Sequence, residues 1–329
     1  MNPHSLTPDS NSDANLSLRP IRWDDAPAIT HLVYEICEAE GDTSVAMTQE
    51  DLLNEWKYEG FDPQRDAVVL ETDEGSAVAY GALFDVCEHY DLSGDVYVHP
   101  NFKTMGIYTD ILRALEIRAD RHTSQAASHQ RVFVRVGMEN KDETGQASLT
   151  TQGYSPIRYH WRMGIELDTQ PLPPNLPAGL EIRPFVKELH AQAVWQARNE
   201  AFKDNWGSHV LSFEEFSYYS FENARYDPTL WVVIWDGEEV AGFSINQYRM
   251  DIGWIHILGV RPAWRKQGLG LAMLFHSFAE FYRRGTKSIG LGVDASNLSG
   301  ATRLYQKVGM SIVNEFTMYE KELRPANID

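Results

Sequence analysis

The residues with the clearest chemical signature lie in a short basic loop between a predicted strand and a predicted helix. The loop reads Val-Arg-Pro-Ala-Trp-Arg-Lys-Gln-Gly-Leu-Gly over residues 260–270. Gly268 and Gly270 allow a tight turn and keep side chains away from the first turn of the helix that follows. The unpaired N–H groups of that turn and the positive end of the helix dipole form a site for an anion. The pattern therefore predicts binding of an anionic group such as a pyrophosphate.

The charge of this loop contrasts with the charge of the whole chain. Arg261, Arg265 and Lys266 place three positive charges close together, whereas the 329 residues carry a formal net charge of −18. A basic loop in so acidic a protein favours an anionic ligand over solvated surface charge. The acidic balance argues against nucleic acid as the main partner, because phosphate contacts dominate that kind of affinity. It suits a cationic amine substrate.

Two strands and two helices must position this loop. A strand is predicted over residues 254–260, and an amphipathic helix follows the loop over residues 269–284. A second buried strand is predicted over residues 287–293. A second helix begins after Asn297 and carries Tyr305.

The two segments together resemble the GCN5-related N-acetyltransferases, the GNAT family. The resemblance is carried by Arg265-x-x-Gly268-x-Gly270 and by a later run that contains Leu291, Asn297, Ala301, Leu304, Tyr305 and Gly309. It implies acetyl-CoA as acyl donor, a splayed pair of parallel strands, and a pyrophosphate held by backbone amides of residues 266–271. The cofactor-binding residues that it implies are Leu258, Gly259, Val260, Arg265, Lys266, Gln267, Gly268, Leu269, Gly270 and Leu271.

Two further residues are candidates for the cofactor. Asn297 is placed to contact the pantetheine arm, and Arg303 is placed to reach the cofactor's phosphates. Helix capping alone would also explain Asn297, and a solvated helix face would explain Arg303. Both alternatives stay open at this point.

The first half of the chain repeats the second at a nearly constant offset. Leu18-Arg-Pro20 matches Ile182-Arg-Pro184, Val98-His-Pro100 matches Val260-Arg-Pro262, and Gly106 matches Gly268. We therefore expect an α/β fold of two tandem GNAT-like domains, each a central mixed β-sheet with a splayed parallel strand pair flanked by helices. Such tandem halves are similar to mycothiol-synthase-like acetyltransferases.

The expected domain organisation has four parts. They are a disordered N-terminal tail at residues 1–16, a degenerate GNAT-like domain at 17–168, a Pro-rich linker at 169–179 and an active GNAT domain at 180–325. The first domain is interpreted as degenerate because three motif positions differ. Lys103 replaces the arginine, Tyr108 replaces the second glycine, and Leu149 replaces the tyrosine. A structural or substrate-shaping role follows for this domain, with cofactor binding without turnover as the alternative.

The expected catalytic residues are Tyr305 and His256. A phenol stays protonated at neutral pH and can donate its proton to the departing thiolate; packing of the ring is the alternative for Tyr305. The carbonyl of the thioester is expected to be polarised by a backbone N–H near Val260, on a strand distorted by a bulge. Direct attack of the amine in a ternary complex is preferred.

The general base is the least defined part of the predicted site. By the two-residue period, Trp254, His256, Leu258 and Val260 share one face of their strand. His256 is the titratable member and is the candidate base, with Asp251, Glu215 or an ordered water as competitors, and backbone-satisfied packing as the alternative for His256.

Composition bounds the remaining possibilities. Cys37 and Cys87 have neither metal nor redox spacing, so we expect no disulfide and no metal site, and a reducing, cytoplasmic compartment. No run of apolar residues reaches the length of a membrane span.

The predicted function is an N-acetyltransferase that uses acetyl-CoA and acts on a small-molecule amine or a peptide amine. The alternatives are a catalytically silent acyl-CoA-binding or regulatory protein and a protein N-terminal acetyltransferase. The sequence does not indicate an oligomeric state.

Overall fold

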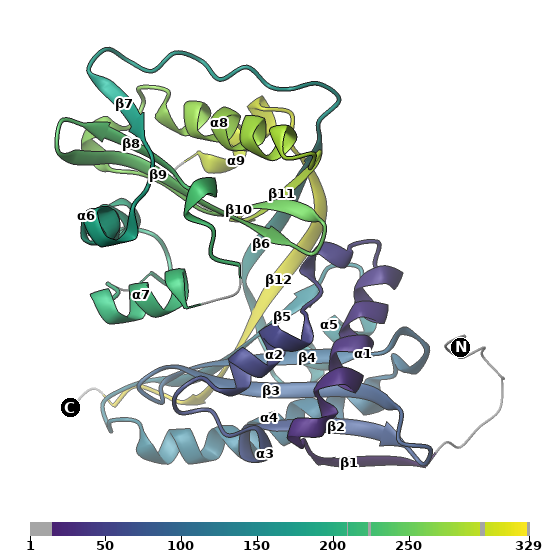
Figure 1. Ribbon diagram of the computed structural model, residues 1–329. Coiled ribbons are helices and arrows are strands. Elements are labelled where there is room, and N and C mark those ends of the chain that lie inside the picture. Colours follow the sequence, from purple (N-terminus) through teal and green to yellow (C-terminus); the bar gives the residue numbers. More distant parts are fainter. Residues whose placement is uncertain (1–14, 209, 223–224, 297–299, 328–329) are drawn as a thin grey trace. The chain divides into compact units, whose positions relative to one another are not determined.

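The computed structural model describes residues 15–208, 210–222, 225–296 and 300–327. These residues form two compact units, one of the residues up to Tyr159 with those from Phe316 onward, and the other from His160 to Glu315. Each unit is a mixed sheet with helices on both faces (Figure 1). Within the described ranges, no helix is long and apolar enough to cross a membrane.

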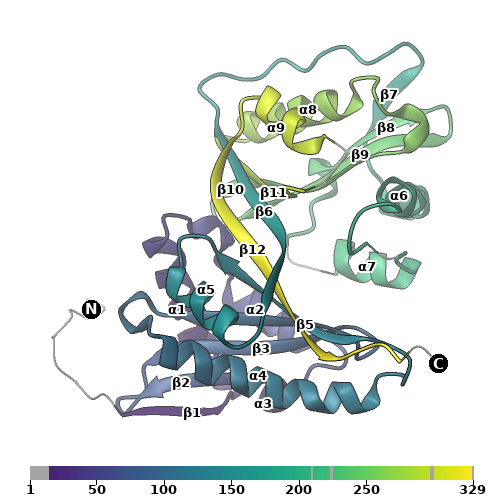
Figure 2. The same ribbon diagram turned by 180° about the vertical axis from the view of Figure 1, so that it is seen from behind.

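The first unit has its strands in the order β1-β2-β3-β4-β5, followed by the second half of β12. Their bounds are β1 Leu16–Pro20, β2 Ala67–Thr72, β3 Ala77–Cys87, β4 Asp91–Val98, β5 Val132–Glu139 and β12 Ser311–Arg324. Its helices are α1 Ala26–Ala39, α2 Gln49–Trp56, α3 Pro63–Asp66, α4 Met105–Gln125 and α5 Glu143–Thr151. Helices α1 and α2 cover one face of this sheet, and α4 and α5 cover the other (Figure 2).

The second unit repeats this order as β7-β8-β9-β10-β11, followed by the second half of β6. Its strands are β6 Ser155–Glu166, β7 Leu180–Arg183, β8 Val232–Asp236, β9 Glu239–Arg249, β10 Ile252–Val260 and β11 Ser288–Asp294. Its helices are α6 Lys187–Phe202, α7 Phe213–Phe221, α8 Leu269–Arg283 and α9 Ala301–Lys307. Side chains of β8 alternate between the two layers. Val233 packs against α6 and α7, whereas Val232 and Ile234 pack against α8. The predicted α/β class with two repeated mixed sheets is confirmed.

Local sequence signals explain where several helices begin. Thr48 and Asp51 form a capping box before α2, with Asp51 N–H donating to Thr48 Oγ1 at 3.1 Å. Ser212 and Glu215 form the same arrangement before α7, where Ser212 N–H donates to Glu215 Oε2 at 2.7 Å. The side chain of Glu215 is therefore used to start a helix.

The two long strands β6 and β12 were not predicted, and they place the unit boundaries differently from the sequence-based domains. Residues 160–166 of β6 pair antiparallel with β11 of the second unit. Phe316–Arg324 of β12 pair antiparallel with β5 of the first unit. Each half of the chain thus donates the end of its last strand to the sheet of the other half. Residues 160–168 and 316–325 consequently lie in units other than those expected.

Both sheets contain a parallel strand pair that separates along its length. In the second unit, β10 and β11 are paired only over Gly253–Ile255 and Ile289–Leu291. In the first, β4 and β5 are paired only over Asp91–Gly94 and Phe133–Val136. Beyond these paired residues, β10 makes no ladder with β11, and β4 makes none with β5. Such an unpaired edge exposes N–H and C=O groups that a bound ligand can use.

Candidate active site

The loop before α8 has a backbone conformation suited to an anion. Lys266 has a φ of 63° and Gly268 has a φ of 85°, and α8 begins directly after Gly268. Residues in the left-handed region next to right-handed ones turn successive N–H groups toward one side, which creates a concave anion site. The first helical hydrogen bond that spans this junction runs from Ala272 N–H to Gly268 O at 3.0 Å. Among the described residues, none accepts a hydrogen bond from the amides of residues 266–271.

The two arginines of the loop are bonded to groups of the protein itself, whereas Lys266 is not. Arg265 donates to the carbonyl of Val260 at 3.2 Å and to that of Ala201, at the end of α6, at 2.9 Å. Arg261 pairs with Glu200, with Nε 2.7 Å from Oε2. Both arginines therefore tie the loop to α6 and β10. Lys266 is exposed and makes no ion pair with any described residue, so it is the cation of this loop left available to a ligand.

Gly270 brings three elements together. A Cβ at this position would lie 2.9 Å from Leu304 Cδ2 of α9 and 3.9 Å from Leu258 Cδ2 of β10. The first turn of α8, the end of β10 and the start of α9 therefore converge around a position without a side chain. The structure thus unites the two sequence motifs, which are separated along the chain by the rest of α8 and by β11.

A β-bulge interrupts β10 at His256. Ile255 pairs with Asn246 of β9 and Ile257 pairs with Ile245, so His256 has no partner on that strand. The expected bulge is confirmed, but the expectation that Trp254, His256, Leu258 and Val260 share one face is wrong. Leu258 and Val260 pack toward α8, while the ring of Trp254 lies against Gly290 on the opposite face. The extra residue of the bulge inverts the alternation, because the side-chain period of a strand is two.

The side chain of His256 projects from the bulge and combines surface exposure with a lowered pKa. It is exposed by surface area, yet neighbouring atoms surround it closely enough that burial lowers its pKa to about 4. The guanidinium groups of Arg249 and Arg225 lower this pKa further, because they disfavour a second positive charge. His256 is therefore a neutral imidazole at pH 7. It can accept a hydrogen bond there, but it is a weak base.

Tyr305 projects from α9 into the core between α9 and the sheet. The residue is 8% exposed, and it packs with Leu291 and Val293 of β11. Burial raises the pKa of its phenol to about 12. The hydroxyl makes no hydrogen bond with a described residue, so it keeps its proton and has it available for a ligand.

A buried polar network fixes α8 to the sheet, and sequence reasoning missed it. Asn246 Nδ2 donates to Ser277 Oγ of α8 at 2.8 Å and to the carbonyl of Leu230 at 2.7 Å. Ser244 Oγ donates to Asn246 Oδ1 at 2.7 Å. Ser244, Asn246 and Ser277 are each at most 1% exposed. An apolar strand interrupted by Ser and Asn on one face is the signal that could have revealed this network.

The remaining candidate residues differ in their exposure. Gln267 and Lys266 are exposed in the loop, Leu269 is buried and Leu271 is half-buried on α8, and Gly259 packs against Phe243 and Phe202. Arg303 is exposed on α9, and Asp251 is exposed in the turn between β9 and β10. Asn297 lies outside the described residues.

The corresponding loop of the first unit lacks the anion-site geometry. None of residues 99–106 has a positive φ, and Thr104 N–H is already bonded to Phe102 O at 2.7 Å. Tyr108, at the position of Gly270, is 1% exposed, and its hydroxyl donates to Asp142. Lys103 contacts Asp142 Oδ2 at 2.8 Å and Glu40 Oε1 at 3.2 Å. Its charge is therefore compensated by carboxylates within the protein.

A cavity of about 270 Å³ lies between the splayed strands of the first unit, and its lining is acidic. The carboxylates that line it belong to Glu40, Asp95, Glu139 and Asp142. Burial, together with the charge of Glu40, raises the pKa of Glu139, and burial raises the pKa of Asp95 to about 6. Lys103 also lines this cavity, but the four carboxylates outnumber it, so the lining disfavours the phosphates of coenzyme A.

Comparisons with known proteins agree with this geometry. The acetyltransferase (GNAT) family model matches residues 191–310, which contain the loop, His256 and Tyr305. A mycothiol acetyltransferase of Paenarthrobacter aurescens is 27% identical over 259 residues, 76% of this chain and 76% of that protein. A mycothiol acetyltransferase of Thermobispora bispora is 26% identical over 306 residues, 90% of this chain and 96% of that protein.

Two solved structures are similar over nearly the whole chain. A GCN5-related N-acetyltransferase from Sphaerobacter thermophilus is 32% identical, with a TM-score of 0.81, and the match covers 95% of this chain and 97% of that one. A tandem GNAT protein from the clavulanic acid biosynthesis pathway is 15% identical, with a TM-score of 0.70 and coverage of 95% and 100%. The second match supports the fold alone.

Proposed function

The chain belongs to the GCN5-related N-acetyltransferase family and is an N-acetyltransferase, and we propose that it acetylates a small-molecule primary amine from acetyl-CoA in its second unit. The observation that carries this proposal is the difference between the two loops. Lys266 and Gly268 give the second loop its left-handed residues and leave six consecutive amides without a described acceptor. The first loop has no such residues, and its cation is paired with Asp142 and Glu40.

The pyrophosphate of acetyl-CoA is held by the backbone amides of residues 266–271, at the positive end of α8. Lys266 supplies the additional positive charge. Arg265 acts through the backbone, because its guanidinium holds Val260 and Ala201. Leu258 and Leu304 form apolar walls beside Gly270.

The splayed end of β10 receives the pantetheine arm and the thioester. Residues 256–260 are not paired with β11, so backbone N–H groups on that edge are free to polarise the carbonyl of the thioester near Val260. The bulge at His256 redirects the strand at this point. The amine then attacks the carbonyl directly within a ternary complex.

The acceptor amine loses its proton with help from the local charge. Arg225 and Arg249 make the surroundings of His256 positive enough to contribute to that histidine's lowered pKa of about 4. The same field lowers the pKa of an ammonium group bound beside His256. The amine therefore gives its proton to water before attack. Neutral His256 orients the amine by accepting a hydrogen bond.

Tyr305 stabilises the departing thiolate. Its pKa of about 12 lies above that of an ordinary thiol, about 8.5. Complete transfer of the phenolic proton to the sulfur is therefore unfavourable, whereas donation of a hydrogen bond is not. The contribution of Tyr305 is charge stabilisation as the carbon–sulfur bond breaks.

The acceptor is tested by measuring release of free coenzyme A with a panel of amines. The panel contains simple primary amines, aminoglycosides, peptides with a free N-terminus, and thiol-bearing amines of the mycothiol type suggested by the relatives' name. Turnover of a small amine, abolished by Gly268→Glu and retained by Gly106→Glu, is expected. Turnover of peptides alone would favour a protein N-terminal acetyltransferase. Activity that survives Gly268→Glu but not Gly106→Glu would place the reaction in the first unit.

A further inference from the structure

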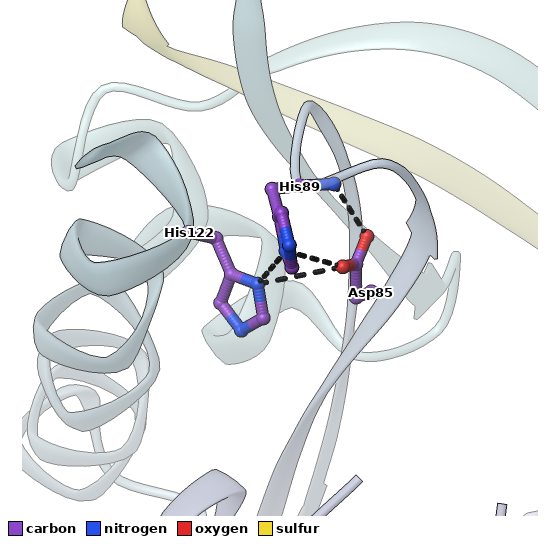
Figure 3. Close-up of side chains that lie close together, drawn as sticks. All are labelled: Asp85, His89 and His122. Atoms are coloured by element: carbon purple, nitrogen blue, oxygen red, sulfur yellow. Dashed lines mark hydrogen bonds and ion pairs between the residues drawn. The ribbon is translucent and has the colours of Figure 1, made fainter. Parts of the chain in front are cut away.

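Three metal-ligating side chains converge in the first unit, in a cluster that shares no residue with the loop before α8 or with the acidic cavity. They are Asp85 of β3, His89 of the turn between β3 and β4, and His122 of α4 (Figure 3). His89 Nδ1 lies 2.6 Å from Asp85 Oδ2 and 3.0 Å from His122 Nδ1. His122 Nδ1 lies 3.6 Å from Asp85 Oδ2. The three facing atoms thus form a small triangle.

Hydrogen bonds alone satisfy these three facing atoms poorly. Two neutral imidazoles can present at most one proton each at Nδ1, and a second N–H would point directly at the first. With the proton on His89 Nδ1, a single hydrogen must serve both the carboxylate of Asp85 and the lone pair of His122. A cation at the centre would bond all three atoms at once. The His89 proton would then reside on Nε2, so the charge of the two imidazoles would not change.

The spacing fits a divalent transition metal. Zn²⁺ binds histidine nitrogen and carboxylate oxygen at about 2.0–2.2 Å, so neighbouring ligands of a tetrahedral site lie about 3.3 Å apart. The observed separations of 2.6, 3.0 and 3.6 Å lie on both sides of that value. Two imidazoles and one carboxylate match the ligand preferences of Zn²⁺ and of its neighbours Co²⁺ and Ni²⁺. Among the described residues no fourth side chain joins the group, which leaves a position for water.

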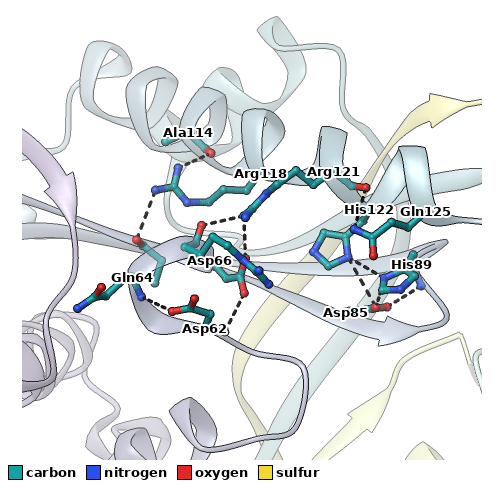
Figure 4. Close-up of polar contacts among 12 residues, drawn as sticks. Asp62, Gln64, Asp66, Asp85, His89, Ala114, Arg118, Arg121, His122 and Gln125 are labelled. Carbon is teal, nitrogen blue, oxygen red and sulfur yellow. Dashed lines mark hydrogen bonds and ion pairs between the residues drawn. The ribbon is translucent and has the colours of Figure 1, made fainter.

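The surrounding structure holds the three ligands in place. His122 is 7% exposed. The next residue toward the N-terminus of α4, Arg121, donates to Asp66 Oδ1 and to the carbonyl of Arg65, both at 2.9 Å, and so fixes α4 against α3 (Figure 4). His89 N–H donates to Asp85 Oδ1 at 2.9 Å, which orients the carboxylate.

The turn that carries His89 is also conformationally unusual. Glu88 and His89 have φ values of 41° and 65°, a left-handed region that is unfavourable for residues other than glycine. This conformation folds His89 back over β3, where its ring meets Asp85 and His122 (Figure 3). A ligand that bonds all three residues offsets that strain.

From this geometry we propose that Asp85, His89 and His122 bind one divalent transition-metal ion, which links the β3–β4 turn to α4. No metal site was expected from the sequence, because these three ligands follow no familiar metal-binding spacing along the chain. Its role is structural. It joins two elements of the first unit and includes no residue of the loop before α8.

The experiment uses the full-length protein after removal of metals by a chelator. Zn²⁺ binding is measured by calorimetry, and Co²⁺ binding by the visible absorption of a tetrahedral or five-coordinate complex. The wild type is expected to bind one ion and to unfold at a higher temperature with Zn²⁺ than without it. His89→Ala and Asp85→Asn should each weaken binding by at least about 10²-fold, since even outer contacts to metal ligands matter by 10–100-fold.

Two controls separate a built site from adventitious binding and from loss of the fold. His129→Ala removes an exposed histidine of the same unit and should leave Zn²⁺ binding unchanged. His89→Ala should keep the metal-free unfolding temperature close to that of the wild type, because the side chain is 37% exposed. The proposal is overturned if the wild type shows no saturable binding of one ion. It is equally overturned if His89→Ala and His129→Ala bind Zn²⁺ as the wild type does.

Discussion

A negative charge placed at Gly268 tests the proposal that the loop before α8 in the second unit binds acetyl-CoA. A Cβ at Gly268 would meet nothing within 4 Å, so Gly268→Glu introduces no clash. Its φ of 85° makes any side chain cost roughly 1–2 kcal/mol of stability. A carboxylate about 5 Å from a phosphate opposes binding by roughly 3 kcal/mol per unit charge at an effective dielectric constant of about 20. We therefore expect the dissociation constant for acetyl-CoA to rise by at least about 10²-fold.

Matched variants separate strain from charge in this prediction. Gly268→Gln has the same backbone strain and nearly the same shape without the charge, so calorimetry should find a smaller loss of affinity than for Gly268→Glu. The difference between the two should shrink at high salt, because exposed charges are screened. Gly106→Glu lies in the first turn of α4 with helical backbone and only Thr104 Oγ1 nearby, at 3.9 Å, and should change affinity little. Equal losses at Gly268 and Gly106 would refute the reasoning.

Three further predictions concern the second unit. Tyr305→Phe keeps the buried ring and removes the hydrogen-bond donor, so kcat should fall roughly 10²-fold with acetyl-CoA affinity nearly unchanged; an unaltered kcat with chemistry rate-limiting would exclude Tyr305. The pKa of His256 is lowered to about 4. The ascending limb of the pH profile of kcat/KM should therefore follow the pKa of the acceptor amine and persist in His256→Gln. A limb near pH ~6.5, the ordinary histidine value, that vanishes in this variant would instead identify His256 as the base. Asn246→Leu leaves the Leu230 carbonyl without its donor and Ser244 Oγ without its acceptor, while Ser277 Oγ keeps its bond to Met273 O. It should lower the free energy of unfolding by about 2–4 kcal/mol, measured by denaturant titration; a loss below about 0.5 kcal/mol would contradict the assigned importance of the network.

The tight turn before α8 could be predicted because its physical cause is local. Gly268 and Gly270, placed between a strand and a helix, require only a tight turn and a helix start, and both are encoded within a few residues. The repeat of Leu18-Arg-Pro20 at Ile182-Arg-Pro184 likewise revealed two copies of one topology, since β1 and β7 occupy the same place in their sheets.

Features that depend on distant partners could not be predicted in the same way. A strand period over residues 311–324 would show only that the segment is extended, not that Phe316–Arg324 pair with β5 of the first unit. The bulge was expected, yet its position at His256 decides which side chains face α8, and one residue of shift inverts the answer. Arg265 was identified as a cofactor contact from its motif, whereas the carbonyls that it binds belong to Val260 and to Ala201 of another helix.

The charges around the two pairs of splayed strands differ between the units. In the first unit, four carboxylates line the space between the strands, and Lys103 is held by Asp142 and Glu40. In the second unit, Arg225 and Arg249 lower the pKa of His256, and the amides of residues 266–271 have no acceptor among the described residues. Replacing Tyr108 by glycine would therefore not suffice to recreate a cofactor site in the first unit. The carboxylates would remain, and the loop would still lack the left-handed residues that aim its N–H groups.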